Sequence, residues 1–105
     1  METKVSNKEN LLQLISAHKG DITGFGVKEL ALFGSFKRNE ATEDSDVDLF
    51  VEFRPGEKNF SNFIRLAFFL QDLFGRKVEL LTRQSLSPFI GPKIMKELEY
   101  VSLTG

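Results

Sequence analysis

Hydrophobic and polar residues alternate most strictly between Asp46 and Phe53, in the segment DVDLFVEF. Successive side chains of a β-strand point to opposite faces of a sheet, so this alternation predicts a strand over these residues. Pro55 and Gly56 follow closely and would end it. One face of the predicted strand is formed by Val47, Leu49, Val51 and Phe53, and the other by Asp46, Asp48, Phe50 and Glu52.

The segment from Phe60 to Phe74 has apolar residues at helical spacing, and Gly75 stands where a helix commonly ends. The pattern predicts a helix over these residues. Apolar residues also occupy its second side, which indicates a helix that is buried or takes part in an interface. We expect part of it to form a surface for a partner or for a second copy of the chain, as a homo-oligomer.

Weaker patterns predict the remaining elements. Ser6 and Glu9 are spaced as a capping box, which predicts a first helix that runs to about His18. Gly20 follows and would break the helical pattern. The whole pattern predicts an α+β (α/β two-layer) fold, with a small mixed β-sheet and helices packed on one face, in a single domain over 1–105. The other predicted elements are strands at 27–33, 77–81 and 100–103, a helical turn at 36–39, and helical turns beginning at Ser87-Pro88 and at Pro92.

The composition fits one folded domain and excludes several classes of function. The chain has 105 residues, of which 41% are hydrophobic and 28% charged, enough for one core. Its net charge of −1 argues against direct nucleic-acid binding as the main function. We expect several basic residues to be solvated surface charges: Arg76, Lys77, Arg83, Lys93 and Lys96. The absence of cysteine excludes disulfides and thiolate metal sites. No apolar stretch approaches the length of a membrane span, and the N-terminus is polar. We therefore expect a cytoplasmic protein that does not enter a membrane, with most of its eleven phenylalanines in the core.

Asp46 and Asp48 have the clearest potential for chemistry. Two positions apart on a strand, their Cα atoms should lie about 6–7 Å apart, with both carboxylates on one face. A divalent cation between them would relieve their repulsion, and hard oxygen ligands favour Mg²⁺ or Mn²⁺. An ordinary solvated strand face would have the same spacing, so the pair alone does not decide between the two interpretations.

Gly34 and Ser35 favour the metal interpretation. They follow directly on the predicted strand at 27–33, and ten residues separate Ser35 from Asp46. A glycine there allows the backbone to approach a phosphate closely, and Ser35 offers a hydroxyl and amide donors at the start of a helix. Alone, the two residues would be an ordinary turn. Together with the two aspartates at this spacing, they form a much rarer combination.

The segment GSFKRNEATEDSDVDLFV resembles the signature of the nucleotidyltransferase superfamily that includes DNA polymerase beta. It is most similar to the minimal, single-domain branch (MNT), which is found as the antitoxin of HEPN–MNT toxin–antitoxin pairs. The similarity continues through the predicted helix, the KVELLT strand and the C-terminal proline turn. The residues that match the signature are Gly34, Ser35, Arg38, Ser45, Asp46, Asp48 and Leu49.

This resemblance implies a site for a nucleoside triphosphate and two Mg²⁺ ions, with Mn²⁺ as an alternative. Asp46, Asp48 and Glu79 would be the catalytic carboxylates and the metal ligands. The branch often has Asp where this chain has Glu79, and an exposed strand residue is the alternative interpretation of Glu79. The implied nucleotide-binding residues are Gly34, Ser35, Lys37, Arg38 and Ser45, although Lys37 and Arg38 could equally be solvated surface cations.

The resemblance also implies a reaction. In this branch, AMP is transferred from ATP to a tyrosine hydroxyl of a cognate HEPN ribonuclease toxin, and pyrophosphate is released. So small a domain has little surface for an acceptor, which fits a partner that brings the hydroxyl. Nothing in the composition or spacing identifies adenine. The alternatives are an antitoxin that masks the toxin without chemistry, and nucleotidyl transfer to a small molecule or an RNA end.

Overall fold

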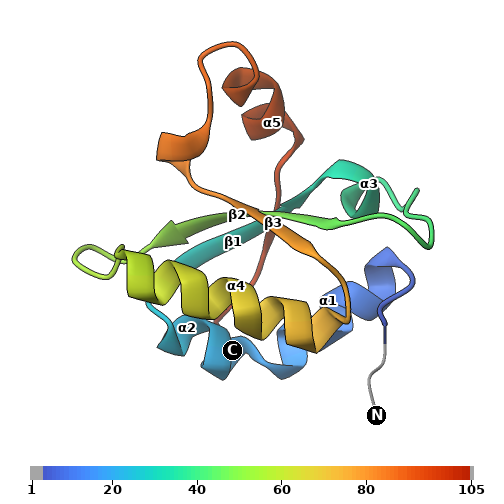
Figure 1. Ribbon diagram of the computed structural model, residues 1–105, viewed down its shortest axis with the longest axis horizontal. Helices are drawn as coiled ribbons and strands as arrows, with labels where there is room; N and C mark the ends of the chain where they lie inside the picture. The colour runs from blue at the N-terminus through green and yellow to red at the C-terminus, as the bar shows by residue number, and fades with distance from the viewer. Residues whose placement is uncertain (1–3, 105) are drawn as a thin grey trace.

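The computed structural model describes residues 4–104, which form a four-stranded mixed sheet covered by helices (Figure 1). The strand order is β3-β2-β1-β4; β2 and β3 are parallel, whereas β1 is antiparallel to both β2 and β4. The predicted α+β fold class is confirmed. The strands are β1 Val27–Phe33, β2 Val47–Phe53, β3 Val78–Leu81 and β4 Glu99–Val101. The helices are α1 Lys8–Ala17, α2 Lys19–Gly24, α3 Gly34–Lys37, α4 Phe60–Phe74 and α5 Gly91–Glu97, with a 3₁₀ turn at Arg83–Ser85.

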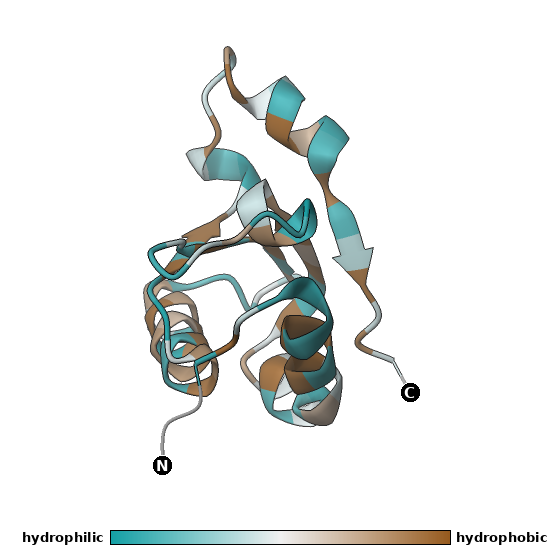
Figure 2. Ribbon diagram, turned by 90° about the vertical axis from the view of Figure 1, so that its right-hand side faces the viewer, coloured by the Kyte–Doolittle hydropathy of each residue, from teal (hydrophilic) through white to brown (hydrophobic). Residues whose placement is uncertain are grey.

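The main helical layer, formed by α1, α2 and α4, covers one face of the sheet, as the sequence predicts (Figure 1). Figure 2 shows this layer edge on, with α5 on the other side of the sheet. The sequence pattern did not predict this position of α5. The principal core lies between the sheet and the main layer and includes Leu11, Ile15, Leu30, Leu32, Leu49, Val51, Leu66 and Leu70.

A second, smaller core explains why α5 lies on the opposite face. Phe33 and Phe50 are buried there and pack against Ile94 and Met95 of α5. The central strand β2 is therefore apolar on both faces at its middle. Asp48 and Glu52 lie before and after Phe50 on this face, so the two carboxylates belong to separate polar regions.

Helix α4 has the predicted bounds. Asn59 caps its first turn by accepting a hydrogen bond from the amide of Asn62 at 2.8 Å. Gly75 ends it in the left-handed conformation, with φ 65°, which a residue without Cβ adopts at no steric cost. These local signals agree with the apolar spacing, and the prediction is confirmed.

The N-terminal prediction was wrong in two details. The cap of α1 is Asn7, whose side chain accepts a hydrogen bond from the amide of Asn10 at 2.8 Å, so Ser6 and Glu9 do not form a capping box. The chain also does not become irregular at Gly20, because α2 follows α1 with a break only at His18. Ile22, which is fully buried, anchors α2 and offsets the weak helix propensity of its glycines.

The phenylalanines divide between core and surface. Phe36, Phe50 and Phe74 are fully buried, whereas Phe60 and Phe68 on α4 are 79% and 59% exposed. The exposed side of α4 keeps the prediction of an interface open. None of the helices within residues 4–104 is long and apolar enough to cross a membrane.

Candidate active site

Gly34 and Asp48 lie in contact where β1 and β2 meet. Gly34 follows the last residue of β1, and Phe33 of β1 is the cross-strand partner of Asp48. Gly34 has φ 74°, and a Cβ placed on it would overlap the carboxylate of Asp48. Glycine is therefore required for both the backbone conformation and the space it leaves. The turn and the aspartate strand, which are distant in the sequence, thus form one site.

Glu79 lies beside Asp48 on the neighbouring parallel strand. Their Cα atoms are register partners, about 4.8 Å apart by strand spacing. Val78 and Leu80 are buried and Glu79 is exposed, as the sequence predicts. Asp46 directly precedes β2 and is partly buried. The structure therefore brings the three predicted carboxylates to the same edge of the sheet.

The electrostatics of Asp48 show how close this grouping is. The pKa of Asp48 is raised to about 6, first by burial and then by repulsion from Glu79 and from Asp46. The positive charge of Arg38 opposes these effects, while Glu97 adds a smaller repulsion. An ionised Asp48 is therefore an unfavourable anion in this environment, and a cation bound there would stabilise it.

The donor set fits a hard divalent cation that also binds phosphate. The side chains offer carboxylate oxygens, which suit Mg²⁺ or Mn²⁺, and no softer ligand. No three His, Cys, Asp or Glu side chains within residues 4–104 are gathered closely enough to form a complete metal site. Mg²⁺ is commonly held by one or two carboxylates, with water and substrate phosphates as its other ligands. Asp46 and Asp48 meet that requirement, and the role of Glu79 as a third ligand stays a prediction.

The two predicted phosphate-binding cations differ in their surroundings. Arg38 donates hydrogen bonds to Glu40 at 2.9 Å and to Glu97 at 3.0 Å. The contact with Glu40 is the largest cause that raises the pKa of Arg38, and the contact with Glu97 adds to it. Arg38 therefore remains charged. Lys37 is partly buried in the last turn of α3. Arg38 would have to exchange a carboxylate for phosphate to contact a nucleotide.

Sequence reasoning missed Glu97. It lies at the end of α5, 59 positions from Arg38 in the chain, and only the packing of α5 on the second face of the sheet brings the two together. Nothing in the local sequence around Glu97 indicates that contact. The fourth carboxylate of this region is therefore a property of the tertiary structure.

Ser35 and Ser45 differ in how their polar groups are used. Ser35 lies in the first turn of α3 and is partly exposed. The Oγ of Ser45 accepts a hydrogen bond from the amide of Thr42 at 2.8 Å and closes the turn before Asp46. Ser35 is therefore better placed to meet a phosphate, whereas Ser45 has a role in shaping the loop. Binding of nucleotide by either residue stays a prediction.

Arg76 corrects an expectation from the sequence. Its place after Gly75, next to Lys77, is typical of a solvated charge, yet the side chain is only 7% exposed. It donates to the carbonyls of Thr42 and Ser45 in the turn before Asp46, at 2.9 and 2.7 Å. Arg76 therefore supports the chain that leads into the aspartate strand.

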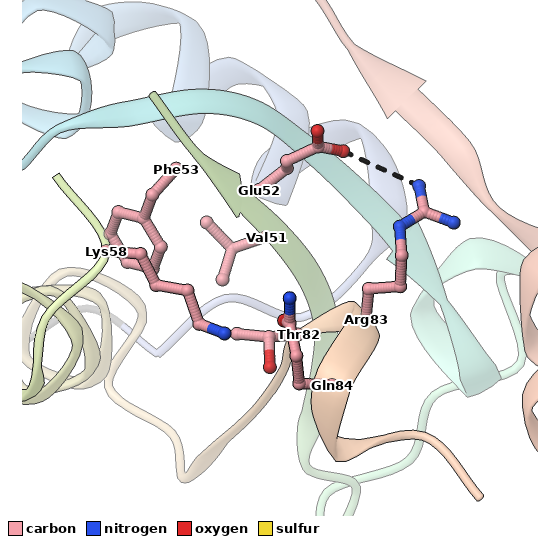
Figure 3. A pocket seen from close by; sticks show the side chains of 7 residues that line it. All are labelled: Val51, Glu52, Phe53, Lys58, Thr82, Arg83 and Gln84. Atoms are coloured by element: carbon pink, nitrogen blue, oxygen red, sulfur yellow. Dashed lines mark ion pairs between the residues drawn. The ribbon is translucent and has the colours of Figure 1, made fainter. Parts of the chain in front are cut away.

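The predicted site is distinct from a hollow of about 160 Å³ at the other end of β2 (Figure 3). There, Glu52 and Arg83 form an ion pair at 3.6 Å. Asp48 lies four residues before Glu52, roughly 13 Å along the strand, beyond the buried Phe50. The hollow is lined by Val51, Glu52, Phe53, Lys58, Thr82, Arg83 and Gln84.

Known proteins share both the sequence and the fold. A family model described as a nucleotidyltransferase domain matches residues 14–101. The chain is 38% identical over 94 residues to the protein adenylyltransferase MntA of Thermococcus cleftensis, covering 89% of this chain and 94% of that protein. A solved structure described as a proposed minimal nucleotidyltransferase has a TM-score of 0.68 at 29% identity, covering 84% of this chain and 93% of that one.

A solved toxin–antitoxin structure with AMP-PNP shares the fold, with a TM-score of 0.66 at 19% identity over 94% of this chain and 75% of that one. The family model spans most of this chain, and it includes the glycine turn and all three carboxylates. The fold and the site are therefore those expected of an enzyme that transfers nucleotidyl groups. The chain belongs to the nucleotidyltransferase domain family and is a nucleotidyltransferase of the minimal, MntA-like type.

Proposed function

We propose that this enzyme transfers AMP from ATP to a tyrosine hydroxyl of a cognate HEPN ribonuclease toxin and thereby acts as its antitoxin. The observation that carries the proposal is the contact between Gly34 and Asp48, which joins a phosphate-binding turn to a carboxylate strand. The similarity to a protein adenylyltransferase supports a protein acceptor. The similar fold of a toxin–antitoxin structure with AMP-PNP supports an adenine nucleotide and a toxin partner.

Each part of the site has a distinct role in this reaction. The amide groups at Gly34 and the hydroxyl of Ser35 bind the triphosphate, and Lys37 and Arg38 offset its negative charge. Asp46 and Asp48 would hold Mg²⁺, with Glu79 as a further ligand. Bound Mg²⁺ would neutralise phosphate charge and lower the pKa of the acceptor hydroxyl.

The group transfer itself forms one bond and breaks one. The tyrosine oxygen attacks the α-phosphorus of ATP, and the bond from that phosphorus to the β-phosphate bridging oxygen breaks. Pyrophosphate leaves with the electron pair of that bond. In this proposal the tyrosine proton passes to Glu79, and the exposure of that carboxylate beside Asp48 supports its role as general base. The product is a tyrosine joined to AMP by a phosphodiester.

The position of the site explains why a partner supplies the acceptor. Asp46 and Asp48 are partly buried at one end of β2, and Glu79 beside them is exposed, away from the hollow lined by Glu52 and Arg83. A tyrosine on a folded partner could reach such a site without any movement of a lid. Docking of the partner would also exclude water from the reacting groups, which strengthens their electrostatic interactions.

The test uses the product of the gene next to this chain's gene, which the proposal expects to be a HEPN protein. The two purified proteins are mixed with ATP and Mg²⁺, and the HEPN protein is weighed by intact mass spectrometry. We expect its mass to rise by one or more AMP units, with peptide sequencing placing the addition on tyrosine. The double variant Asp46→Asn with Asp48→Asn should abolish the mass change.

A matched control removes two carboxylates elsewhere. Asp44 and Asp72 are both exposed, and the double variant Asp44→Asn with Asp72→Asn should transfer AMP at the wild-type rate. If the wild-type protein binds and inhibits the HEPN protein with no mass change, the chain is a masking antitoxin and the proposal is wrong. If AMP is transferred to a small molecule or to an RNA end and not to the toxin, the proposed acceptor is wrong but the proposed nucleotidyl transfer holds.

A further inference from the structure

Arg76 is the single buried charged residue within residues 4–104, and it joins segments that are far apart in the chain. Its Nε donates to the carbonyl of Val5 at 2.7 Å. Its Nη1 lies within hydrogen-bonding distance of the carbonyls of Thr42, Glu43 and Ser45, at 2.9, 3.3 and 2.7 Å. The planar guanidinium, with five donors in a fixed arrangement, is suited to several acceptors at once.

The same guanidinium also contacts the phosphate-binding turn. Its central carbon lies 5.0 Å from the centre of the Phe36 ring, within the range of a cation–π interaction. Phe36 is 1% exposed and belongs to α3, directly after Ser35. Arg76 therefore contacts both parts of the site: the helix that carries Ser35, and the turn that ends at Asp46.

Arg76 is held by backbone carbonyls and by an aromatic ring rather than by an ion pair. No carboxylate within residues 4–104 forms an ion pair with it, although burying an unpaired charge costs free energy. An apolar residue of the same volume would leave the carbonyls of Val5, Thr42 and Ser45 without this donor. A guanidinium is needed if three carbonyls of one turn and the face of one ring must be held in a fixed relation.

We propose that Arg76 is a positioning residue that sets the distance between the phosphate-binding turn at Gly34-Ser35 and the metal-binding Asp46 and Asp48. It does not contact the substrate; it acts through Phe36 on one side and the 42–45 turn on the other. This inference rests on the proposed nucleotide and metal site. Lysine, with one ammonium group, cannot span the same acceptors.

Arg76→Lys is the test, and Arg54→Lys is its matched control. Arg54 also donates to two backbone carbonyls, those of Thr23 and Val27, at 3.1 and 3.3 Å, and it lies just after β2, at the end of that strand away from Asp48. Both variants should lose some stability, so all assays are made well below both unfolding temperatures. In AMP transfer, kcat should fall at least about tenfold in Arg76→Lys, as expected for misplaced catalytic groups, with the KM for the acceptor unchanged. Arg54→Lys should keep kcat within about twofold.

A second measurement needs no acceptor and no turnover. In two-dimensional amide NMR spectra, Arg76→Lys should shift or broaden the signals of both Ser35 and Asp46, and Arg54→Lys should leave them in place. If Arg76→Lys does not fold, Phe36→Leu removes the ring and keeps most of the apolar volume, and the same pair of signals should move. Unchanged Ser35 and Asp46 signals, or a kcat equal to that of the Arg54 control, would overturn the inference.

The two proposals can fail separately. If wild-type protein transfers no AMP while the NMR signals of Ser35 and Asp46 respond together to Arg76→Lys, the proposed reaction is wrong and the positioning role holds. If wild-type protein is active and Arg76→Lys retains its kcat, the proposed reaction holds and the positioning role is wrong.

Discussion

Replacing Asp48 with asparagine should stabilise the folded protein in the absence of metal. Burial and the neighbouring carboxylates raise the pKa of Asp48 from 3.8 to about 6. A shift of about two units corresponds to about 3 kcal/mol, at 1.36 kcal/mol per unit. The carboxylate remains partly open to water, so screening reduces this, and we expect a gain of about 1–2 kcal/mol in the free energy of unfolding at pH 8.

The gain should depend on pH in a defined direction. A carboxylate with a raised folded-state pKa binds protons more tightly in the folded than in the unfolded chain. Its destabilising effect is absent below about pH 4, grows as the pH rises to about 6, and is complete above that value. The advantage of Asp48→Asn should therefore be largest at pH 8 and shrink towards pH 4.5.

Urea unfolding, followed by circular dichroism, measures the free energy of unfolding of the wild type and of Asp48→Asn. The protein is kept in a chelator, and the free energies are extrapolated to water at pH 4.5 and pH 8. Asp44→Asn, which removes an exposed carboxylate in the preceding loop, is the control and should change stability by less than about 0.5 kcal/mol at either pH. Equal stability of wild type and Asp48→Asn at pH 8, or a gain that does not vary with pH, would refute the electrostatic reasoning. Adding Mg²⁺ and ATP should then stabilise the wild type more than the variant, since the ligand binds the ionised site.

Three further substitutions test other parts of the structure. Gly34→Ala should destabilise the protein by at least about 1–2 kcal/mol because φ is positive there and the new Cβ would displace the Asp48 carboxylate; urea unfolding measures the loss, and calorimetry should show weaker binding of ATP with Mg²⁺. Asn7→Ala should cost about 1 kcal/mol through loss of the helix cap, whereas Ser6→Ala should be close to neutral; an equal loss in both would restore the capping-box prediction. Phe68→Ser should leave stability nearly unchanged because the ring is 59% exposed, but should weaken binding to the HEPN protein in a titration if this side of α4 is the interface; unaltered affinity would exclude Phe68 from it.

The elements that the sequence predicted well are those whose local and long-range requirements coincide. Both β1 and α4 have the predicted bounds, and β2 starts one residue later than predicted. In α4, helical spacing, an N-cap asparagine and a C-terminal glycine all favour the same limits. The signature indicated that Gly34 and Asp48 belong to one site, whereas their direct contact is seen only in the structure.

The errors arose where tertiary contacts decide between local options. Ser6 and Asn7 are both good caps, and only the extended backbone at Asn7, with φ −152° and ψ 173°, places its side chain over the first turn. Arg76 was expected on the surface because the carbonyls that accept its hydrogen bonds are far from it in the sequence. Val5, Thr42 and Ser45 lie 71, 34 and 31 positions away, so no local pattern indicates that they surround one guanidinium.

The unfavourable features of this fold are concentrated at one edge of the sheet. Gly34 has a positive φ, and the pKa of the Asp48 carboxyl is raised by its surroundings. Arg76 is a buried cation without a carboxylate partner. Only the cost at Asp48 could be relieved by a single substitution, because the turn requires glycine at 34 and the carbonyls around Arg76 require a hydrogen-bond donor. The gathering of these features around one short stretch of backbone is the expected result when a site must bind a highly charged ligand. A bound metal and triphosphate would compensate these costs, because the metal stabilises the carboxylates and the turn at Gly34 leaves room for phosphate. The cost of the partly buried Asp48 carboxylate is therefore a physical argument for a bound cation at this site.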